Sequence, residues 1–240
     1  RYRNPSKLTK IAASVHVISG DRVEMGIGAG CYEHEYVGYG YPFPSAGERI
    51  GQLEESIQIM RAMWSEESVD FDGDHFRLQG AICSPKGLQD RIPIWVAGGG
   101  ERKTLSVAAR YADYTNFGLT VDEFRRKDAI LREHCESVGR DESEIGRSSN
   151  FFLFCAETEL GARAKRDEAI DRFASTTGQG ADNPMVRNWV SLAGTPAMLL
   201  DHFGPWADAR LDYAIMGFLD LAYDTSSMEL FATEVMSHLR

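Results

Sequence analysis

The sequence contains few of the features that mark secreted, membrane-bound or nucleic-acid-binding proteins. Its four cysteines stand far apart and form no CxxC pair, which predicts reduced thiols in the cytoplasm. No apolar run approaches the roughly 20 residues of a membrane span, and the charged N-terminus lacks the apolar core of a signal peptide. The net charge of −10 argues against general nucleic-acid binding, which needs a basic face. We therefore expect a cytoplasmic protein that acts on a small molecule, with neither a membrane nor a nucleic acid as partner.

Several catalytic and metal-binding signatures are also missing. The six histidines share no metal-ligand spacing, so no metal site is predicted. No G-x-S-x-G nucleophile elbow is present, and "AGGGERKT" lacks the G-K-[ST] ending of a P-loop. What the chain does have is 43% hydrophobic residues over 240 positions, which is enough for one large core.

Apolar strands alternate with amphipathic helices along most of the chain. A first helix begins after Asn4, which is a good N-cap, with Pro5 in its first turn. Each strand that follows leads to a helix or to a loop before one, and the expected strands lie near residues 23, 92, 113, 148 and 212. This order predicts an α/β fold in which helices cover both faces of a parallel sheet.

The segment "SVDFDGDHFRLQG" interrupts this alternation. It predicts a β-hairpin, because Asp72-Gly73 is a favoured two-residue turn between alternating segments. No linker or short repeat divides the chain. We therefore predict a single domain over residues 1–240, with the hairpin as an insertion at about 66–91.

The glycine-rich stretch "VEMGIGAGCYEHEY" tests whether the chain has a dinucleotide-binding βαβ unit. That fingerprint needs G-x-G-x-x-G leading straight into a helix, but Cys31 stands where the third glycine should be. Glycines and prolines between residues 38 and 44 also predict that no helix begins at this turn. A strand that opens into an irregular loop, here to about residue 46, fits a (β/α)₈ barrel better, since such loops build barrel active sites.

Three ordered segments resemble the bacterial luciferase-like monooxygenase family, with the coenzyme F420-dependent oxidoreductases as the most similar branch. They are "YRNPSKLTKIAASVHVISGDRVEMGIGAG", "GERIGQLEESIQIMRAMW" and "IPIWVAGGGERKTLSVAARYAD", and the late segment "LAGTPAMLLDHFGPWADARLDYAIMGF" matches as well. The resemblance implies a luciferase-like (β/α)₈ TIM barrel. Five of its eight strands lie in this sequence, so the first roughly three strands are expected to precede Arg1.

The turn "AGGGER" is the clearest candidate site. Ala97, Gly98, Gly99 and Gly100 end a strand before a helix, where exposed N–H groups and the helix dipole favour an anion. Arg102 is expected in the first helical turn, beside Lys103, where cations are unfavourable unless an anion neutralises them. The resemblance implies that this turn holds a cofactor phosphate. The alternative is a plain turn with a solvated basic pair.

A second group of candidates follows the strand near residue 23. Small residues at Gly28, Ala29 and Gly30 would let a flat ring system lie against the backbone. Cys31 is either a substrate contact or a buried small hydrophobe. The resembled F420 enzymes have tryptophan there and the sugar-phosphate dehydrogenases glutamate, so Cys31 weakens the case for sugar-phosphate oxidation. His34 either relays a proton or hydrogen-bonds the cofactor, or else it faces solvent.

Further pocket candidates come from other elements. By the resemblance, Arg49 reaches the phosphate; the alternative is an ion pair with Glu48 or Glu54. Asn116 ends a short strand and could line the pocket. The aromatic residues Tyr39, Tyr41 and Phe43 form either a wall over the cofactor or a packed loop.

Together these features predict an F420-dependent oxidoreductase that transfers a hydride between the deazaflavin and a small organic substrate. An acidic chain would need a basic mouth for the acidic cofactor tail, and the candidates are Arg1, Arg3, Lys7, Arg102 and Lys103. The alternatives are a two-component FMN-dependent monooxygenase, served by a separate flavin or F420 reductase, and a non-catalytic flavin-binding protein. The resemblance also implies a homodimer.

Overall fold

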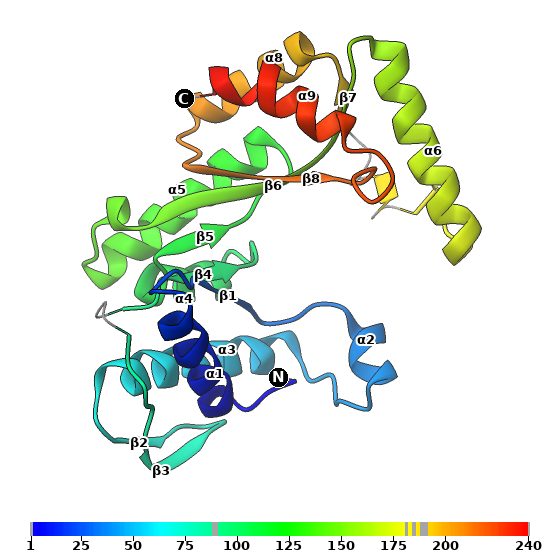
Figure 1. The fold of residues 1–240 in the computed structure, drawn as a ribbon. Helices are drawn as coiled ribbons and strands as arrows, with labels where there is room; N and C mark the ends of the chain where they lie inside the picture. Colours follow the sequence, from blue (N-terminus) through cyan, green and yellow to red (C-terminus); the bar gives the residue numbers. More distant parts are fainter. Residues whose placement is uncertain (1, 88–90, 181, 184–185, 188–191, 240) are drawn as a thin grey trace. The chain divides into compact units, whose positions relative to one another are not determined.

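The computed structural model describes residues 2–87, 91–180, 182–183, 186–187 and 192–239, and these form two compact units (Figure 1). The first unit comprises Arg1–Asn116 with Lys127–Gly146, and the second comprises Phe117–Arg126 with Arg147–Arg240. Elements up to residue 116 are α1 (Pro5–Ile18), β1 (Met25–Gly28), α2 (Glu33–Gly38), α3 (Ala46–Ser65), β2 (Val69–Asp72), β3 (Arg77–Ala81), β4 (Ile94–Ala97), α4 (Thr104–Tyr111) and β5 (Tyr114–Asn116). Later elements are α5 (Val121–Val138), η1 (Glu142–Glu144), β6 (Gly146–Cys155), α6 (Glu159–Thr177), β7 (Leu192–Gly194), α8 (Pro196–Asp208), β8 (Tyr213–Phe218), α9 (Ser226–Glu234) and η2 (Met236–His238).

In the first unit, β1, β4 and β5 form a parallel sheet in that order. One face of this sheet is buried, because Ile94 and Val96 of β4 have at most 1% of their surface exposed. Helix α4 packs against β4, α3 packs against α4, and α1 packs against α3. Asn4 caps α1 by accepting the Ser6 N–H at 3.0 Å, which confirms the predicted helix start.

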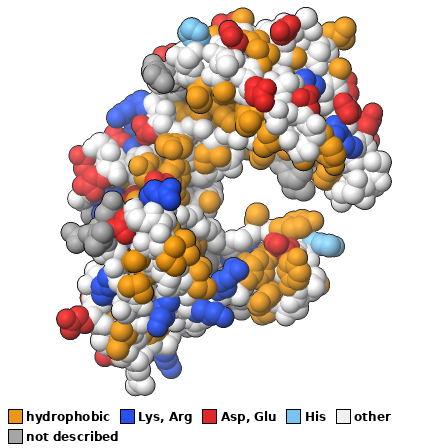
Figure 2. Space-filling model, viewed as in Figure 1, with side chains coloured by type: hydrophobic (Ala, Val, Ile, Leu, Met, Phe, Trp, Pro, Cys, Tyr) orange, Lys and Arg blue, Asp and Glu red, His pale blue; other side chains and the backbone are white. Residues whose placement is uncertain are grey.

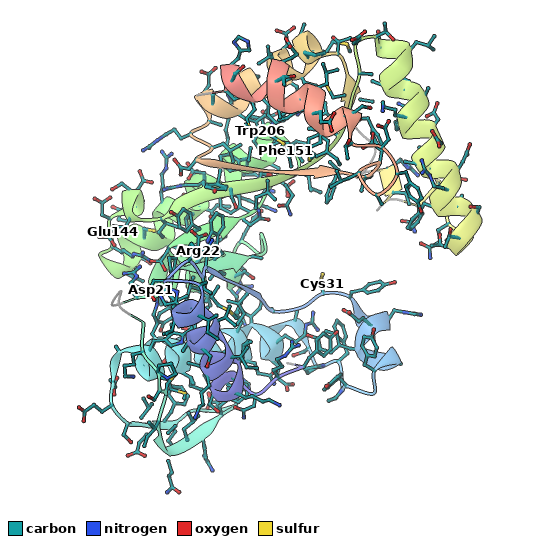
Figure 3. The ribbon with its side chains drawn as sticks, in the orientation of Figure 1. Asp21, Arg22, Cys31, Glu144, Phe151 and Trp206 are labelled. Atoms are coloured by element: carbon teal, nitrogen blue, oxygen red, sulfur yellow. The ribbon has the colours of Figure 1, made fainter. Side chains whose placement is uncertain are left out.

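In the second unit, β6 pairs in parallel with both β7 and β8. Its core is aromatic: Phe151 of β6 meets Trp206 and Phe203 of α8 edge-on, with ring centroids 4.7 and 4.9 Å apart (Figure 3). Thr195 caps α8 and Pro196 occupies its first position, as the sequence predicts. The strand β7 was not predicted, since three residues give too short a pattern to recognise.

Two local predictions were wrong. A helix does begin after the turn at residue 30: α2 runs from Glu33 to Gly38. The glycines that follow end this helix after six residues, but they do not prevent it. The hairpin forms, but Asp72 pairs with Arg77, so its loop has four residues where two were expected. The Glu55 carboxylate stabilises this longer loop by accepting the backbone N–H groups of residues 74, 75 and 76.

A partly buried ion pair joins the elements of the first unit. Asp113 accepts hydrogen bonds from the backbone N–H of Ile94 at 2.7 Å and from Arg61 Nη2 at 2.5 Å. Arg61 also donates to the carbonyls of Ile92 and Tyr111 at 3.2 and 3.1 Å. These bonds connect α3 with the start of β4 and the end of α4. Burial lowers the pKa of Arg61, because it removes water from around the charged form, and the nearby Arg140 acts in the same direction.

We predict that Asp113→Ala lowers the free energy of unfolding by about 3 kcal/mol, because it leaves the half-buried Arg61 charge unpaired. Urea unfolding measures this change. The matched control is Asp72→Ala. Asp72 also forms an ion pair, with Arg77 Nε at 2.6 Å, but its side chain is 82% exposed. Its effect should stay below about 1 kcal/mol. Equal effects of the two variants would contradict the structure.

The four thiols differ in their environment. Cys31 is exposed, and the other three are buried. Burial raises the pKa of the Cys155 thiol to about 11, with the Asp220 carboxylate acting in the same direction. Burial likewise raises the pKa of Cys83. Since the thiolate is the reactive form, the buried thiols should be inert in the folded protein.

We therefore predict that iodoacetamide at about pH 8 alkylates Cys31 alone in the native protein. Peptide mass spectrometry identifies the labelled residue, and labelling in urea, which should reach all four thiols, serves as the control. Native labelling of Cys155 or protection of Cys31 would show that this part of the structure is wrong.

Candidate functional site

The strand register brings three predicted site residues into one row. Gly28 of β1 lies beside Ala97 of β4, which lies beside Asn116 of β5. All three stand at the carboxyl ends of parallel strands, where α/β proteins bind their ligands. The backbones approach closely, since a Cβ on Gly28 would lie 3.2 Å from the Ala97 carbonyl oxygen. A side chain larger than that of glycine therefore does not fit readily at position 28.

A second row lies one pleat deeper on the same face of the sheet, because side chains alternate along a strand. It contains Gly26, Trp95 and Tyr114. The Trp95 and Tyr114 rings stack with centroids 4.1 Å apart and planes 12° apart. Trp95 Nε1 also donates to a Glu24 carboxylate oxygen at 2.6 Å. These contacts make a fixed aromatic floor below the row of small residues.

The glycine turn follows directly from the end of β4. Gly98 has φ +124°, a backbone conformation that other residues rarely adopt. Its N–H donates to the Asn116 carbonyl at 3.1 Å, so the turn is tied to β5. Helix α4 begins at Thr104, and none of the side chains that the structure describes caps its N-terminus. Arg102 and Lys103 therefore lie before the helix, which corrects their predicted place in its first turn.

Lys127 of α5 approaches the middle of the turn. A Cβ on Gly99 would lie 2.3 Å from Lys127 Nζ, so the ammonium group rests against the glycine backbone. His134, about two helical turns further along α5, has Nε2 2.7 Å from the Glu101 carbonyl oxygen. That nitrogen must carry the proton, since a carbonyl only accepts. The turn thus combines glycine backbone, an uncapped helix start and a cation, which together favour an anion.

The sequence alone does not predict that Lys127 and His134 lie at the glycine turn. Both belong to an amphipathic helix rich in charged residues, where neighbouring arginines have the same local pattern. Helical periodicity predicts a polar face, but it does not say which cation of that face reaches a turn about 28 residues away in the chain.

The segment after β1 is held by Arg49. Arg49 Nε donates to the Gly30 carbonyl at 3.1 Å, and another guanidinium nitrogen donates to the Pro44 carbonyl. The guanidinium also lies over the Phe43 ring, 3.9 Å from its centroid. Glu54, one of the expected partners of Arg49, pairs with Arg110. A contact between Arg49 and a phosphate stays a prediction.

The aromatic residues near α2 pack together through a residue that the sequence did not single out. The Tyr2 ring lies 4.8 Å from Tyr36, 4.9 Å from Tyr41 and 6.5 Å from Tyr39, and Tyr36 meets Phe43 at 5.0 Å. Gly30 needs its φ of +76° and its missing side chain here, because a Cβ would lie 2.2 Å from the Tyr36 hydroxyl. These contacts favour the packed-loop interpretation over a wall.

Cys31 and His34 are both exposed. The Cys31 side chain projects from the segment between β1 and α2 (Figure 3), so the expectation that it is a buried small hydrophobe was wrong. The His34 ring lies 5.8 Å from the Tyr32 ring. Ala29 adjoins this segment and is half-buried. The catalytic roles of Cys31 and His34 stay predictions.

Two other kinds of site receive no support in the described part of the chain. No group of three or more His, Cys, Asp and Glu side chains there could hold a metal ion. Within the same residues, no helix combines the length and apolar character needed to cross a bilayer.

Comparison with known proteins identifies relatives of two kinds. An FMNH(2)-dependent dimethylsulfone monooxygenase of Pseudomonas putida is 25% identical over 99% of this chain and 71% of its own length. An F420-dependent glucose-6-phosphate dehydrogenase of Mycolicibacterium fortuitum is 33% identical over 61% of this chain and 44% of its own length. The chain thus spans less than half of the second relative.

The fold has a counterpart among solved structures. The coenzyme F420-dependent tetrahydromethanopterin reductase of Methanopyrus kandleri superposes with a TM-score of 0.79 over 99% of this chain and 80% of that one, at 17% identity. The fold is thus the luciferase-like TIM-barrel α/β fold that the sequence predicts. The model of the luciferase-like monooxygenase family matches residues 1–212. The chain belongs to the luciferase-like monooxygenase family.

Proposed function

We propose that the chain is part of an F420-dependent oxidoreductase that binds the cofactor phosphate at the glycine turn, residues 98–100. The observation that supports this most directly is the convergence of the Gly98–Gly100 backbone, the uncapped start of α4 and the Lys127 ammonium on one turn. Arg102 is exposed beside it and adds positive charge. A phosphate accepts hydrogen bonds from backbone N–H groups and is attracted by both cations.

The row of Gly28, Ala97 and Asn116 fits the flat part of such a cofactor. It lies at the end of the strand that enters the glycine turn, and its first two members present almost no side chain. A ring system can therefore lie against the backbone there, above the floor of Trp95 and Tyr114. When bound, the deazaflavin supplies the carbon that accepts or donates the hydride. The residues of the chain contribute orientation and exclude water from one face of the ring.

Oxidation of a substrate hydroxyl releases a proton together with the hydride. We assign His34 to receive that proton, because its imidazole is exposed on α2, directly after the segment that leaves β1 at the cofactor row, and imidazole can take up a proton near neutral pH. Cys31, three residues earlier, is the accompanying substrate contact in this proposal.

A flavin-dependent monooxygenase is the second candidate function. It is favoured by the Pseudomonas putida relative, which is named as FMNH(2)-dependent and matches 99% of the chain. FMN also carries a phosphate, so the same turn serves either cofactor. In that case a separate reductase supplies the reduced flavin. Under either candidate we propose a homodimer acting on a small organic substrate.

We predict that the protein binds F420 more tightly than FMN, and that Lys127→Ala and Arg102→Ala each weaken binding about tenfold, the effect of losing one charge-assisted hydrogen bond. Fluorescence quenching follows each titration. Gly99→Ala should match Lys127→Ala, because the new Cβ displaces the Lys127 ammonium. The control is Lys10→Ala on the exposed side of α1.

Preference for FMN would assign the protein to the monooxygenase branch. Unchanged affinity in the three turn variants would contradict the phosphate site itself. Tight binding without turnover of any substrate would support a non-catalytic flavin-binding protein.

For His34 we predict that His34→Gln lowers kcat about 100-fold, the lower end of the usual contribution of a general base, while the cofactor Kd stays unchanged. Steady-state kinetics measures kcat once a substrate is known, and fluorescence titration measures the Kd. Unchanged kcat would show that His34 only faces solvent.

A further inference from the structure

A separate pocket of about 330 Å³ opens beside the carboxyl end of β1, within the first unit. Residues 27–29 are among those that line it, so it shares Gly28 with the cofactor row. The volume lies near the lower end of the range for small-molecule sites, about 300–1,000 Å³. The pocket therefore has room for a small ligand, but not for a whole deazaflavin.

The charge of the lining is unusual for this protein. Arg3, Arg49 and His75 all line the pocket, while none of its described lining residues is aspartate or glutamate. The chain as a whole carries a net charge of −10. Lys and Arg side chains also lie on the visible surface around α1 and α3 (Figure 2). Two arginines and a histidine, with no carboxylate among the described lining residues, favour an anionic ligand.

The remaining lining provides both polar and apolar contacts. Gln52 and Ser56 stand one turn apart on α3, and they present an amide and a hydroxyl. Leu53 and Phe76 provide apolar walls. This combination suits an acidic group carried on a small apolar body.

Contacts outside the pocket fix its walls. The Glu55 carboxylate accepts hydrogen bonds from the backbone N–H groups of His75 and Phe76, and these bonds fix the position of both residues. The His75 ring lies directly on Gly51 of α3, where a Cβ would be 2.6 Å from Nε2. Tyr2, next to Arg3, is packed among the tyrosines of the α2 region. The pocket is thus formed before any ligand arrives, which lowers the entropic cost of binding.

We propose that this pocket is a second anion site, which binds the phosphate or carboxylate of a small ligand with an apolar body. It extends the proposed function but does not depend on it, since Arg102 and Lys127 lie at the glycine turn, whereas Arg3 and His75 line this pocket. The acidic group comes either from a substrate or from the tail of the cofactor. In both cases the recognising chemistry is the same: Arg3 and His75 around the acid, with Leu53 and Phe76 against the body.

The test uses phenyl phosphate as probe and isothermal titration calorimetry with the full chain. We expect a Kd of about 1 mM or below for phenyl phosphate, and weaker binding of both inorganic phosphate and phenol. Arg3→Gln should weaken phenyl phosphate binding about tenfold. Gly51→Ala should do the same by displacing His75, and alanine is the better helix former at that position, so the fold is preserved.

Two controls separate this site from the glycine turn. Arg77→Gln, on the exposed end of the hairpin, should leave phenyl phosphate binding unchanged. Arg102→Ala should leave unchanged the part of phenyl phosphate binding that Arg3→Gln removes, although it weakens binding at the glycine turn. Two results would overturn the proposal. One is no detectable binding at a phenyl phosphate concentration about tenfold above the expected Kd. The other is equal binding by Arg3→Gln and the unmodified chain. Loss of the Arg3-dependent part of the binding in Arg102→Ala would overturn it as well, because it would place this anion at the glycine turn.

The source of the acidic group follows from competition. If saturating F420 displaces phenyl phosphate and Arg3→Gln also weakens F420 binding, the cofactor tail occupies the pocket. If F420 and phenyl phosphate bind together, the acid belongs to a separate substrate. Both results support the anion site, and they assign it to different ligands.

Discussion

The parallel register of β1, β4 and β5 is the constraint on which the candidate site depends. It ends the three strands at one level, and so it places Gly28, Ala97 and Asn116 side by side. The Gly98 N–H bond to the Asn116 carbonyl then fixes the direction in which the chain leaves β4. A shift of one residue in β4 would turn its site-facing side chains to the opposite face of the sheet. The Asp113–Arg61 pair opposes such a shift, because the Asp113 carboxylate accepts a hydrogen bond from the first backbone N–H of β4, that of Ile94.

Glycines around this row serve different physical purposes. Gly28 allows two backbones to approach, Gly98 allows an unusual φ, and Gly99 leaves room for the Lys127 ammonium. Gly51, far from the turn in sequence, makes room for an imidazole ring and thereby shapes the second pocket. Missing side chains in this unit therefore define where ligands and cations fit, as much as the side chains that are present.

Much of the fold follows from local sequence signals. The structure confirms the helix starts at Asn4 and Thr195 and the five expected strands. The family match confirms membership of the luciferase-like family. What the sequence missed depends on contacts distant along the chain. The four-residue hairpin loop exists because Glu55, about 20 residues earlier, binds its amides. The short helix α2 is stabilised by the packing of Tyr36 against Tyr2 and Phe43. Periodicity and turn propensity do not encode such partners.

The sequence predicted the glycine backbone of the candidate site, but it did not predict all of the cationic side chains around it. The glycines are visible as letters, but Lys127 and His75 reach their positions only through the packing of α5 and the hairpin. The two proposed anion sites are therefore distinguishable by their side chains: Arg102 and Lys127 at the turn, Arg3 and His75 at the pocket.

The most direct test of the central claim is amide NMR of the protein during titration with F420. If the cofactor phosphate binds at the glycine turn, the resonances of Gly98, Gly99, Gly100 and Thr104 shift together and saturate with the Kd measured by fluorescence. The amides of the exposed hairpin end, near Asp72 and Arg77, should stay unchanged. Saturable shifts elsewhere in the chain, with the glycine amides unmoved, would contradict the phosphate site and the function built on it.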